Sequence, residues 1–240
     1  MKRFICDGTA HGFFSAVFDA YNCKECVICS NKDVQLDLNT QIINVETDEQ
    51  KARRVIKKLE EIDKFSVDEI SLLLRSCRDD REQTAFEYIR LIVKSGRAVR
   101  TALSNPVVME MTDIRASVTS EIHRFKGFLR FVESQSGVFY APFSPDNFII
   151  DLLMPHFVAR FKNERFVLHD VKRKVACLYD GNSWIMRNAD QAEIYLSAYE
   201  KVFEKLWKKY YDSVNIPERK NEKQMRGYMP VRYWKFLTEK

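Results

Sequence analysis

The chain has 240 residues and a net charge of +5, with 45% hydrophobic and 30% charged residues but only 7 glycines and 6 prolines. This composition favours one large or two small globular domains and excludes a disordered chain with long flexible linkers. No apolar run approaches the roughly 18 residues of a membrane span, and the N-terminus lacks a secretory leader, so we expect a cytoplasmic protein with no membrane partner.

The first predicted region, residues 1–121, opens as a small α/β unit. Residues 4–6 form a short apolar run that reads as a strand, and Thr9 is placed to cap the helix that follows. Residues 27–38 alternate loosely between apolar and polar side chains, and residues 42–45 form a brief apolar run; both predict further strands. A strand, a helix and another strand in this order are typical of a small α/β unit.

Residues 48–131 are predicted to be largely helical, because their apolar side chains recur at helical spacing. Ser66, with Glu69 three residues later, has the pattern of a capping box at the start of one helix. Another helix is predicted over residues 81–103, and Pro106 suits the first turn of a long helix after it.

The second predicted region, residues 122–240, changes to a period of two near Lys126. Residues 127–133 and 138–142 flank a Ser- and Gly-containing turn, which predicts a β-hairpin. Asp146 is then placed to cap an amphipathic helix that ends near residue 161.

A second hairpin is predicted over residues 166–170 and 175–179, and Asp190 is placed to cap a last amphipathic helix that reaches residue 210. The second region thus reads ββαββα, which predicts an antiparallel sheet with helices on one face. The fold class is therefore α+β, with a helix-rich first half and a sheet-containing second half. The two regions form either two domains or one compact unit.

The charge is unevenly distributed between the halves. Residues 1–121 carry 18 basic and 20 acidic side chains, a net charge of −2, whereas residues 122–240 carry 21 and 14, a net charge of +7. This asymmetry indicates that the second half faces a polyanion.

The last 26 residues alternate basic and aromatic side chains. Cations neutralise phosphates and flat rings stack on bases, so this pattern is typical of a nucleic-acid surface. The alternative is an arm whose rings pack on the body while its cations stay in water. The candidate DNA-binding residues in this arm are Arg219, Arg226, Arg232, Tyr233, Trp234 and Lys235.

Three further clusters combine basic residues with groups that could act as acids or bases. They are His123 with Arg124, Lys126 and Arg130; His156 with Arg160; and Asp170 with Lys172, Arg173 and Lys174. The basic members are candidates for phosphate contacts, and His123, His156 and Asp170 are the catalytic candidates. The alternative is a hydrogen-bonded structural role for each histidine and a turn role for Asp170.

Cys23, Cys26 and Cys29 form a C-x2-C-x2-C run that resembles the first three ligands of a ferredoxin-type cluster. The fourth ligand of that run is missing, and a zinc site would need a distant fourth ligand. We therefore treat the three as weak metal candidates, interpret them as incidental thiols, and expect no cofactor.

The chain resembles, over essentially its whole length, a bacterial family assigned to DNA metabolism or repair whose members carry a domain of unknown function. The matching residues are Cys6-Asp7-Gly8, Gly12-Phe13, Ala20-Tyr21, residues 123–131 (HRFKGFLRF), Tyr140-Ala141-Pro142, Pro155-His156-Phe157, Arg160-Phe161, Asp170, Tyr179-Asp180-Gly181, Ile216-Pro217-Glu218-Arg219, Asn221, Met229-Pro230 and Arg232-Tyr233-Trp234-Lys235. The resemblance implies a radical-SAM partner in DNA metabolism, and some family members are fused to a uracil-DNA-glycosylase-like domain. The cysteine run departs from the family pattern, which implies that the partner carries any iron–sulfur chemistry.

Our leading hypothesis is a DNA-associated accessory protein that acts with the radical-SAM partner in DNA repair or modification. One alternative is a nuclease or base-acting enzyme that uses His123, His156 and Asp170. Another is a scaffold that binds only protein, which leaves the charge asymmetry unused. The sequence leaves open whether the protein catalyses a reaction.

Overall fold

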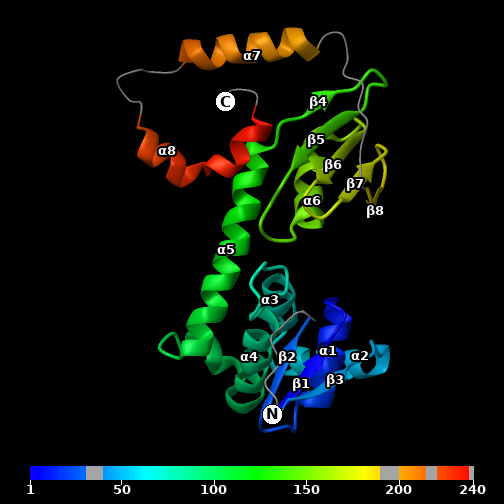
Figure 1. Cartoon of the computed structure of the whole chain (residues 1–240), viewed down its shortest axis with the longest axis vertical. Helices are drawn as coiled ribbons and strands as arrows, with labels where there is room; N and C mark the ends of the chain where they lie inside the picture. Colours follow the sequence, from blue (N-terminus) through cyan, green and yellow to red (C-terminus); the bar gives the residue numbers. More distant parts are fainter. Residues whose placement is uncertain (31–39, 190–199, 215–220, 238–240) are drawn as a thin grey trace. The chain divides into compact units, whose positions relative to one another are not determined.

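The computed structural model describes residues 1–30, 40–189, 200–214 and 221–237, except for the side chains of residues 200–203, 211 and 212. The chain divides into two compact units, Met1–Thr119 and Ser120–Lys240 (Figure 1). The fold is α+β as predicted, with a helical first half and the larger sheet in the second half. None of the helices in the described ranges is long and apolar enough to cross a membrane.

Unit 1 contains a three-stranded parallel sheet in the order β2-β1-β3. The central strand is β1 (Lys2–Ile5), which pairs with β2 (Cys26–Cys29) and β3 (Gln41–Asn44). α1 (Ala10–Ala20) connects β1 to β2 and packs against β2 and the next helix. The predicted α/β opening is thus confirmed, although most of the strand predicted over residues 27–38 lies outside the described residues.

The Asp7 carboxylate links the loop after β1 to the loop after β3. It accepts hydrogen bonds from the Thr9 backbone (2.9 Å), the Thr9 hydroxyl (2.7 Å) and the Thr47 hydroxyl (2.8 Å). Thr9 Oγ1 in turn accepts from the Gly12 backbone at 2.9 Å, which confirms the predicted helix cap. A Cβ at Gly12 would lie 2.0 Å from Asp7 Oδ1, so a larger residue would displace this carboxylate.

The helices predicted between residues 48 and 131 are present. Gly96, at φ +60°, ends the third of them earlier than expected, and a 3-10 turn follows. The elements are α2 (Glu49–Ile62), α3 (Ser66–Leu73), α4 (Arg81–Ser95), η1 (Gly96–Thr101) and α5 (Pro106–Phe128), which begins in unit 1 and ends in unit 2.

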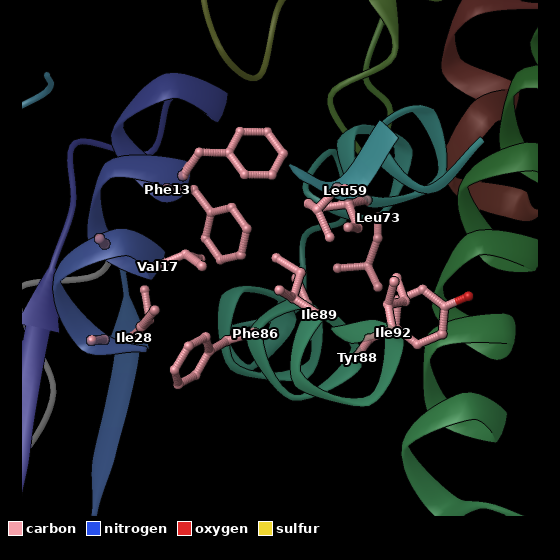
Figure 2. Packing of buried hydrophobic residues seen from close by; sticks show 14 of the residues in the cluster. Phe13, Val17, Ile28, Leu59, Leu73, Phe86, Tyr88, Ile89 and Ile92 are labelled. Carbon is pink, nitrogen blue, oxygen red and sulfur yellow. The ribbon is translucent and has the colours of Figure 1, made fainter. Parts of the chain in front are cut away.

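Buried side chains from α1, β2, α2, α3 and α4 meet in the core of unit 1 (Figure 2). Phe13 on α1, Leu59 on α2 and Phe86 on α4 are each at most 1% exposed. Burial of one such side chain contributes about 1.5–3 kcal/mol relative to leaving it in water. The helical spacing of apolar residues in the sequence therefore corresponds to faces that pack in this core.

The predicted capping box at the start of α3 is wrong. Ser66 lies inside the helix and donates its hydroxyl to the Asp63 carbonyl at 2.7 Å. Glu69 pairs instead with Arg100 at 3.1 Å and with Arg115. The two arginines belong to η1 and α5, which are distant from Glu69 in the sequence. Local sequence spacing therefore does not reveal that they pair with its carboxylate.

Unit 2 contains a five-stranded sheet in the order β4-β5-β6-β7-β8. Its strands are β4 (Val132–Glu133), β5 (Phe139–Phe143), β6 (Phe166–Asp170), β7 (Val175–Tyr179) and β8 (Trp184–Asn188). All pairs are antiparallel except β5 with β6, which are parallel. The expectation of a purely antiparallel sheet is therefore wrong, because α6 (Ile150–Phe161) returns the chain to the starting end of the sheet before β6 begins.

Both predicted hairpins of unit 2 are confirmed, but several boundaries differ. Residues 127 and 128, predicted to begin a strand, remain in α5, so β4 is only two residues long. Asp146 does not cap α6, whose N-cap is Ile149 without a side-chain hydrogen bond. β8 was not predicted, and all five of its residues are exposed.

The C-terminal part of unit 2 is helical in the described residues. α7 (Glu200–Val214) covers the later part of the predicted last helix, and the expected cap at Asp190 lies outside the described residues. The arm contains α8 (Glu222–Tyr228) and η3 (Val231–Phe236), two short helices that the sequence did not predict.

Candidate nucleic-acid interface

The segment after α5 is held against α6 by aromatic packing. The ring of Phe131 lies 5.1 Å from that of Phe157, 4.5 Å from that of Phe161 and 5.9 Å from that of Phe166. Aromatic pairs at such separations add about 0.5–1.5 kcal/mol each beyond the area they bury. This packing positions the neighbouring Arg130 beside α6.

A pocket of about 650 Å³ opens between this segment, α6 and α7. Its size lies in the range of small-ligand sites. It is lined by Leu129, Arg130, Phe131, Phe157, Arg160, Phe161, Glu204, Leu206, Trp207 and Tyr210. The sequence assigned Arg130 and Arg160 to separate clusters, and the fold brings them to the same pocket.

Two aromatic rings on α7 form one wall of this pocket. The rings of Trp207 and Tyr210 lie 5.7 Å apart at an angle of 37°, and the Arg130 guanidinium lies 5.4 Å from the centre of the Trp207 ring. Trp207 is 38% exposed and Tyr210 57%. A guanidinium over an indole face is attracted by the ring quadrupole, so Arg130 links α7 to the rest of the pocket.

His156 lies one turn before Arg160 on α6 and is influenced by Lys126 of α5. Burial lowers the pKa of His156 below its usual value of 6.5, and the positive charges of Lys126 and Arg160 lower this pKa further, although a hydrogen bond to the Lys126 backbone opposes them. Its Nε2 is buried and makes no hydrogen bond within the described part of the chain. The imidazole is therefore neutral near pH 7, between two cations.

The remaining basic and histidine candidates of α5 lie near its C-terminal end. His123 is exposed and Arg124 is half-buried, and neither lines the pocket. The structure thus unites Arg130 and Arg160, with Lys126 and His156 beside them, but leaves His123 and Arg124 outside the pocket.

Asp170 is fully buried and forms the turn between β6 and β7. Its carboxylate accepts hydrogen bonds from the Lys172 and Arg173 backbones (3.1 and 3.2 Å) and pairs with Arg173 Nη1 at 3.0 Å. Arg173 also donates to the carbonyls of Pro145 (3.1 Å) and Asp146. Asp170 and Arg173 therefore hold the turn together, which is the structural alternative left open by the sequence, and Lys172 and Lys174 are exposed.

The C-terminal arm is anchored by Tyr233, which is 1% exposed. Its ring lies 4.5 Å from that of Phe125, and its hydroxyl donates to Glu121 at 2.7 Å. Arg232 pairs with Asp146 at 2.5 Å, and the Trp234 indole donates to the Met229 carbonyl at 3.0 Å.

This anchoring corrects one expectation, because the buried Tyr233 ring has no face to offer a base. The exposed cations of the described arm are Lys223, Arg226, Arg232 and Lys235, and Arg226 pairs with Glu222 at 3.6 Å. Arg219 lies outside the described residues.

Some residues of interest were missed by the sequence reasoning. Tyr210 was counted only among the apolar residues of the predicted last amphipathic helix, and Trp207 was not singled out. Lys205, Lys208 and Lys209 alternate with these two rings in the same basic-aromatic pattern as in the arm.

A partly buried pair on the main sheet was missed as well. Tyr140 Oη lies 2.6 Å from His169 Nδ1, and His169 Nε2 lies 3.2 Å from the Ala189 carbonyl. The parallel pairing of β5 with β6 creates this contact, so no local pattern indicates it.

The cysteine run does not form a convergent ligand set in the structure. The Cys26 thiol donates to the carbonyls of Ala20 (3.6 Å) and Cys23 (3.4 Å), on the side of β2 that faces the end of α1. Cys29 follows three positions later in the same strand, and side chains an odd number of positions apart point to opposite faces. Across the described ranges, no three His, Cys, Asp or Glu side chains are grouped to hold a metal ion.

The fold and the pocket define a two-unit α+β protein whose basic second unit carries a cationic, aromatic pocket. The chain belongs to the DUF4130 family, a domain of unknown function whose family model matches residues 79–239. That match includes all of unit 2 except its last residue, together with α4, η1 and the first part of α5. No curated protein and no solved structure matches the chain.

Proposed function

We propose that the protein is a DNA-associated accessory factor in DNA repair or modification that acts with a radical-SAM partner. The observation that carries this proposal is the pocket in which Arg130 and Arg160 lie beside exposed aromatic rings. Cations that neutralise phosphates and rings that stack on bases are the two components of sequence-tolerant DNA binding.

The electrostatics of the pocket support a polyanionic ligand. Glu204 is the acidic residue in the lining, and its carboxylate is paired with Lys208 at 2.6 Å. Because that charge is compensated, Arg130 and Arg160 give the lining a net positive charge. The pocket also lies in the half of the chain that carries the charge of +7.

The test is DNA binding as a function of salt concentration, measured by fluorescence anisotropy for the wild type, Arg130→Gln and Arg160→Gln. Each lost phosphate contact should reduce the slope of log affinity against log salt by about 0.7–0.9. Arg187→Gln is the matched control, since Arg187 is an exposed arginine of the same unit that does not line the pocket.

The proposal is contradicted if the wild type does not bind DNA even at low salt. It is also contradicted if Arg130→Gln and Arg160→Gln show the same salt dependence as Arg187→Gln. The radical-SAM partner rests on the family resemblance of the sequence. Co-purification of the two proteins with and without DNA tests it, and separate elution under both conditions would contradict it.

A second function, a base-acting or nuclease enzyme, is favoured by one observation. His156 is neutral, has a buried Nε2 without a hydrogen bond in the described residues, and lies close to two candidate phosphate-binding cations. A neutral imidazole can act as a general base. Product analysis of DNA incubated with the wild type and with His156→Gln tests this function, which requires a product that the variant does not form.

A further inference from the structure

We infer that the pocket between α6, α7 and the segment Leu129–Phe131 binds an unpaired nucleobase, which stacks on Trp207 and Tyr210. This inference rests on the proposed DNA association and specifies its substrate class, single-stranded or locally opened DNA. It is carried by the exposure of the two rings, by the concave shape of the site and by the cations around it.

The first step concerns the rings. Trp207 and Tyr210 are three residues apart on α7 and therefore neighbours on one helix face, where their ring centres are 5.7 Å apart. Leu206 beside them is 56% exposed. Large apolar side chains on an amphipathic helix normally pack against the protein, so their exposure beside a pocket marks a binding surface.

The second step concerns the form of DNA that fits. In a duplex the faces of the bases are covered by stacking, and only the base edges and the backbone are accessible. A side-chain ring can stack on a base only after that base has left the helix or belongs to a single strand. A pocket of about 650 Å³ lined by rings therefore suits one extruded base and not an intact duplex.

The third step excludes an apolar protein segment as the preferred occupant. Arg130 and Arg160 line the pocket, and Lys205 and Lys209 are exposed on α7 beside Lys208, whose charge is paired with that of Glu204. A second copy that docked through its own α7 would bring the Lys205 and Lys209 charges of both helices together, and like charges at close range repel. A base with its phosphates satisfies both the rings and the cations.

The experiment compares the affinity of the full chain for a labelled single strand and for a duplex of the same sequence. Trp207→Ala and Tyr210→Ala should each weaken single-strand binding about tenfold or more and leave duplex binding within about twofold. Trp207→Phe keeps a ring and should retain affinity within about threefold. Circular dichroism of each variant shows whether the fold is intact.

A second measurement does not depend on loss of the ring. The chain has three tryptophans, so Trp184→Phe combined with Trp234→Phe leaves Trp207 as the single tryptophan. Its fluorescence should be quenched by the single strand at the concentrations that give binding, and not by the duplex.

The outcomes separate the inference from the proposed function. If the chain binds single strand and duplex equally, and Trp207→Ala changes neither affinity, the inference is overturned and DNA association remains. No binding of either form would overturn both. Self-association that is lost in Trp207→Ala, with DNA affinity unchanged, would identify a second copy as the occupant and also overturn the inference.

Discussion

Tyr233 and Glu121 are 112 residues apart in the sequence, and the tyrosine hydroxyl donates a hydrogen bond to the glutamate at 2.7 Å. Glu121 is 3% exposed, and its carboxylate also accepts hydrogen bonds from the Asp146 backbone and from the backbone and side chain of Asn147. Burial, together with the neighbouring carboxylate, raises the pKa of Tyr233 well above its usual value. This contact closes the C-terminal arm onto the end of α5 within unit 2.

Removal of the Tyr233 hydroxyl should therefore destabilise the protein. Tyr233→Phe leaves the buried Glu121 carboxylate without one of its donors, and we expect a loss of about 1–3 kcal/mol in the free energy of unfolding measured in urea. Tyr228→Phe is the control, because Tyr228 is 70% exposed in the same arm. Equal stability of the two variants would show that the arm is not anchored in this way.

The arm arginines should separate DNA contact from stability. Arg226→Ala should weaken DNA binding and reduce the salt slope by about 0.7–0.9, with an unchanged melting temperature, because the exposed pair with Glu222 contributes little. Arg232→Ala should weaken binding similarly and cost at most about 1 kcal/mol, since its pair with Asp146 is half-exposed.

Arg53→Ala provides the matched control for these arginines. Arg53 is also an exposed member of an i,i+4 pair, with Glu49 at 3.2 Å, but it lies in unit 1. If its loss reduces DNA affinity as much as loss of Arg226 does, the effect is one of net charge and the arm has no specific role.

Asp170 should prove to be a stability residue. Asp170→Ala removes the acceptor of two backbone hydrogen bonds and leaves the Arg173 guanidinium without its carboxylate partner, so we expect a loss of about 3–5 kcal/mol. Asp180→Ala, at an exposed turn with backbone hydrogen bonds to Asn182 and Ser183, is the control and should cost less. A stable Asp170→Ala protein with altered DNA processing would instead support the catalytic alternative.

Because of His156, the free energy of unfolding should decrease as the pH falls. Its pKa is 6.5 in the unfolded chain and lower in the folded protein, because of burial and the charges of Lys126 and Arg160. As the pH falls below about 6.5, the unfolded state takes up a proton first, so stability declines until the lower folded-state pKa is passed, by at most about 1.4 kcal/mol per pH unit.

Urea unfolding between about pH 7.5 and pH 5 measures this decline. It should be smaller in His156→Gln, which cannot take up the proton. His123→Gln controls for the loss of an exposed histidine. An identical pH profile in the wild type and in His156→Gln would contradict the assignment.

The cysteine run should not carry an iron–sulfur cluster. Cys26 and Cys29 point to opposite faces of β2, so they cannot both bind one cluster without distortion of the strand. Elemental analysis of anaerobically purified protein should give no stoichiometric iron. About four irons per chain, lost in Cys26→Ala, would show that this prediction is wrong.

Features that depend on a few neighbouring residues could be predicted from the sequence. The Thr9 cap follows from a local hydrogen bond, and the start of α5 at Pro106 follows from the fixed φ of proline. The hairpin of β6 and β7 follows from the period of two in its apolar side chains. The same reasoning failed for the capping box of Ser66 with Glu69 and for the cap at Asp146, because distant arginines pair with the Glu69 and Asp146 carboxylates. Arg100 and Arg115 take the Glu69 carboxylate needed for a capping box, and Arg232 takes the Asp146 carboxylate.

The sequence by itself determined the helical first half, the sheet in the second half and the basic character of the C-terminal region, because composition and periodicity are properties of the chain alone. The tertiary structure decided the parallel pairing of β5 with β6, the burial of Tyr233 against Glu121 and the meeting of Arg130, Arg160, Trp207 and Tyr210 in one pocket. Those contacts join residues tens of positions apart, and their energy comes from packing and desolvation, which no local pattern of residues encodes.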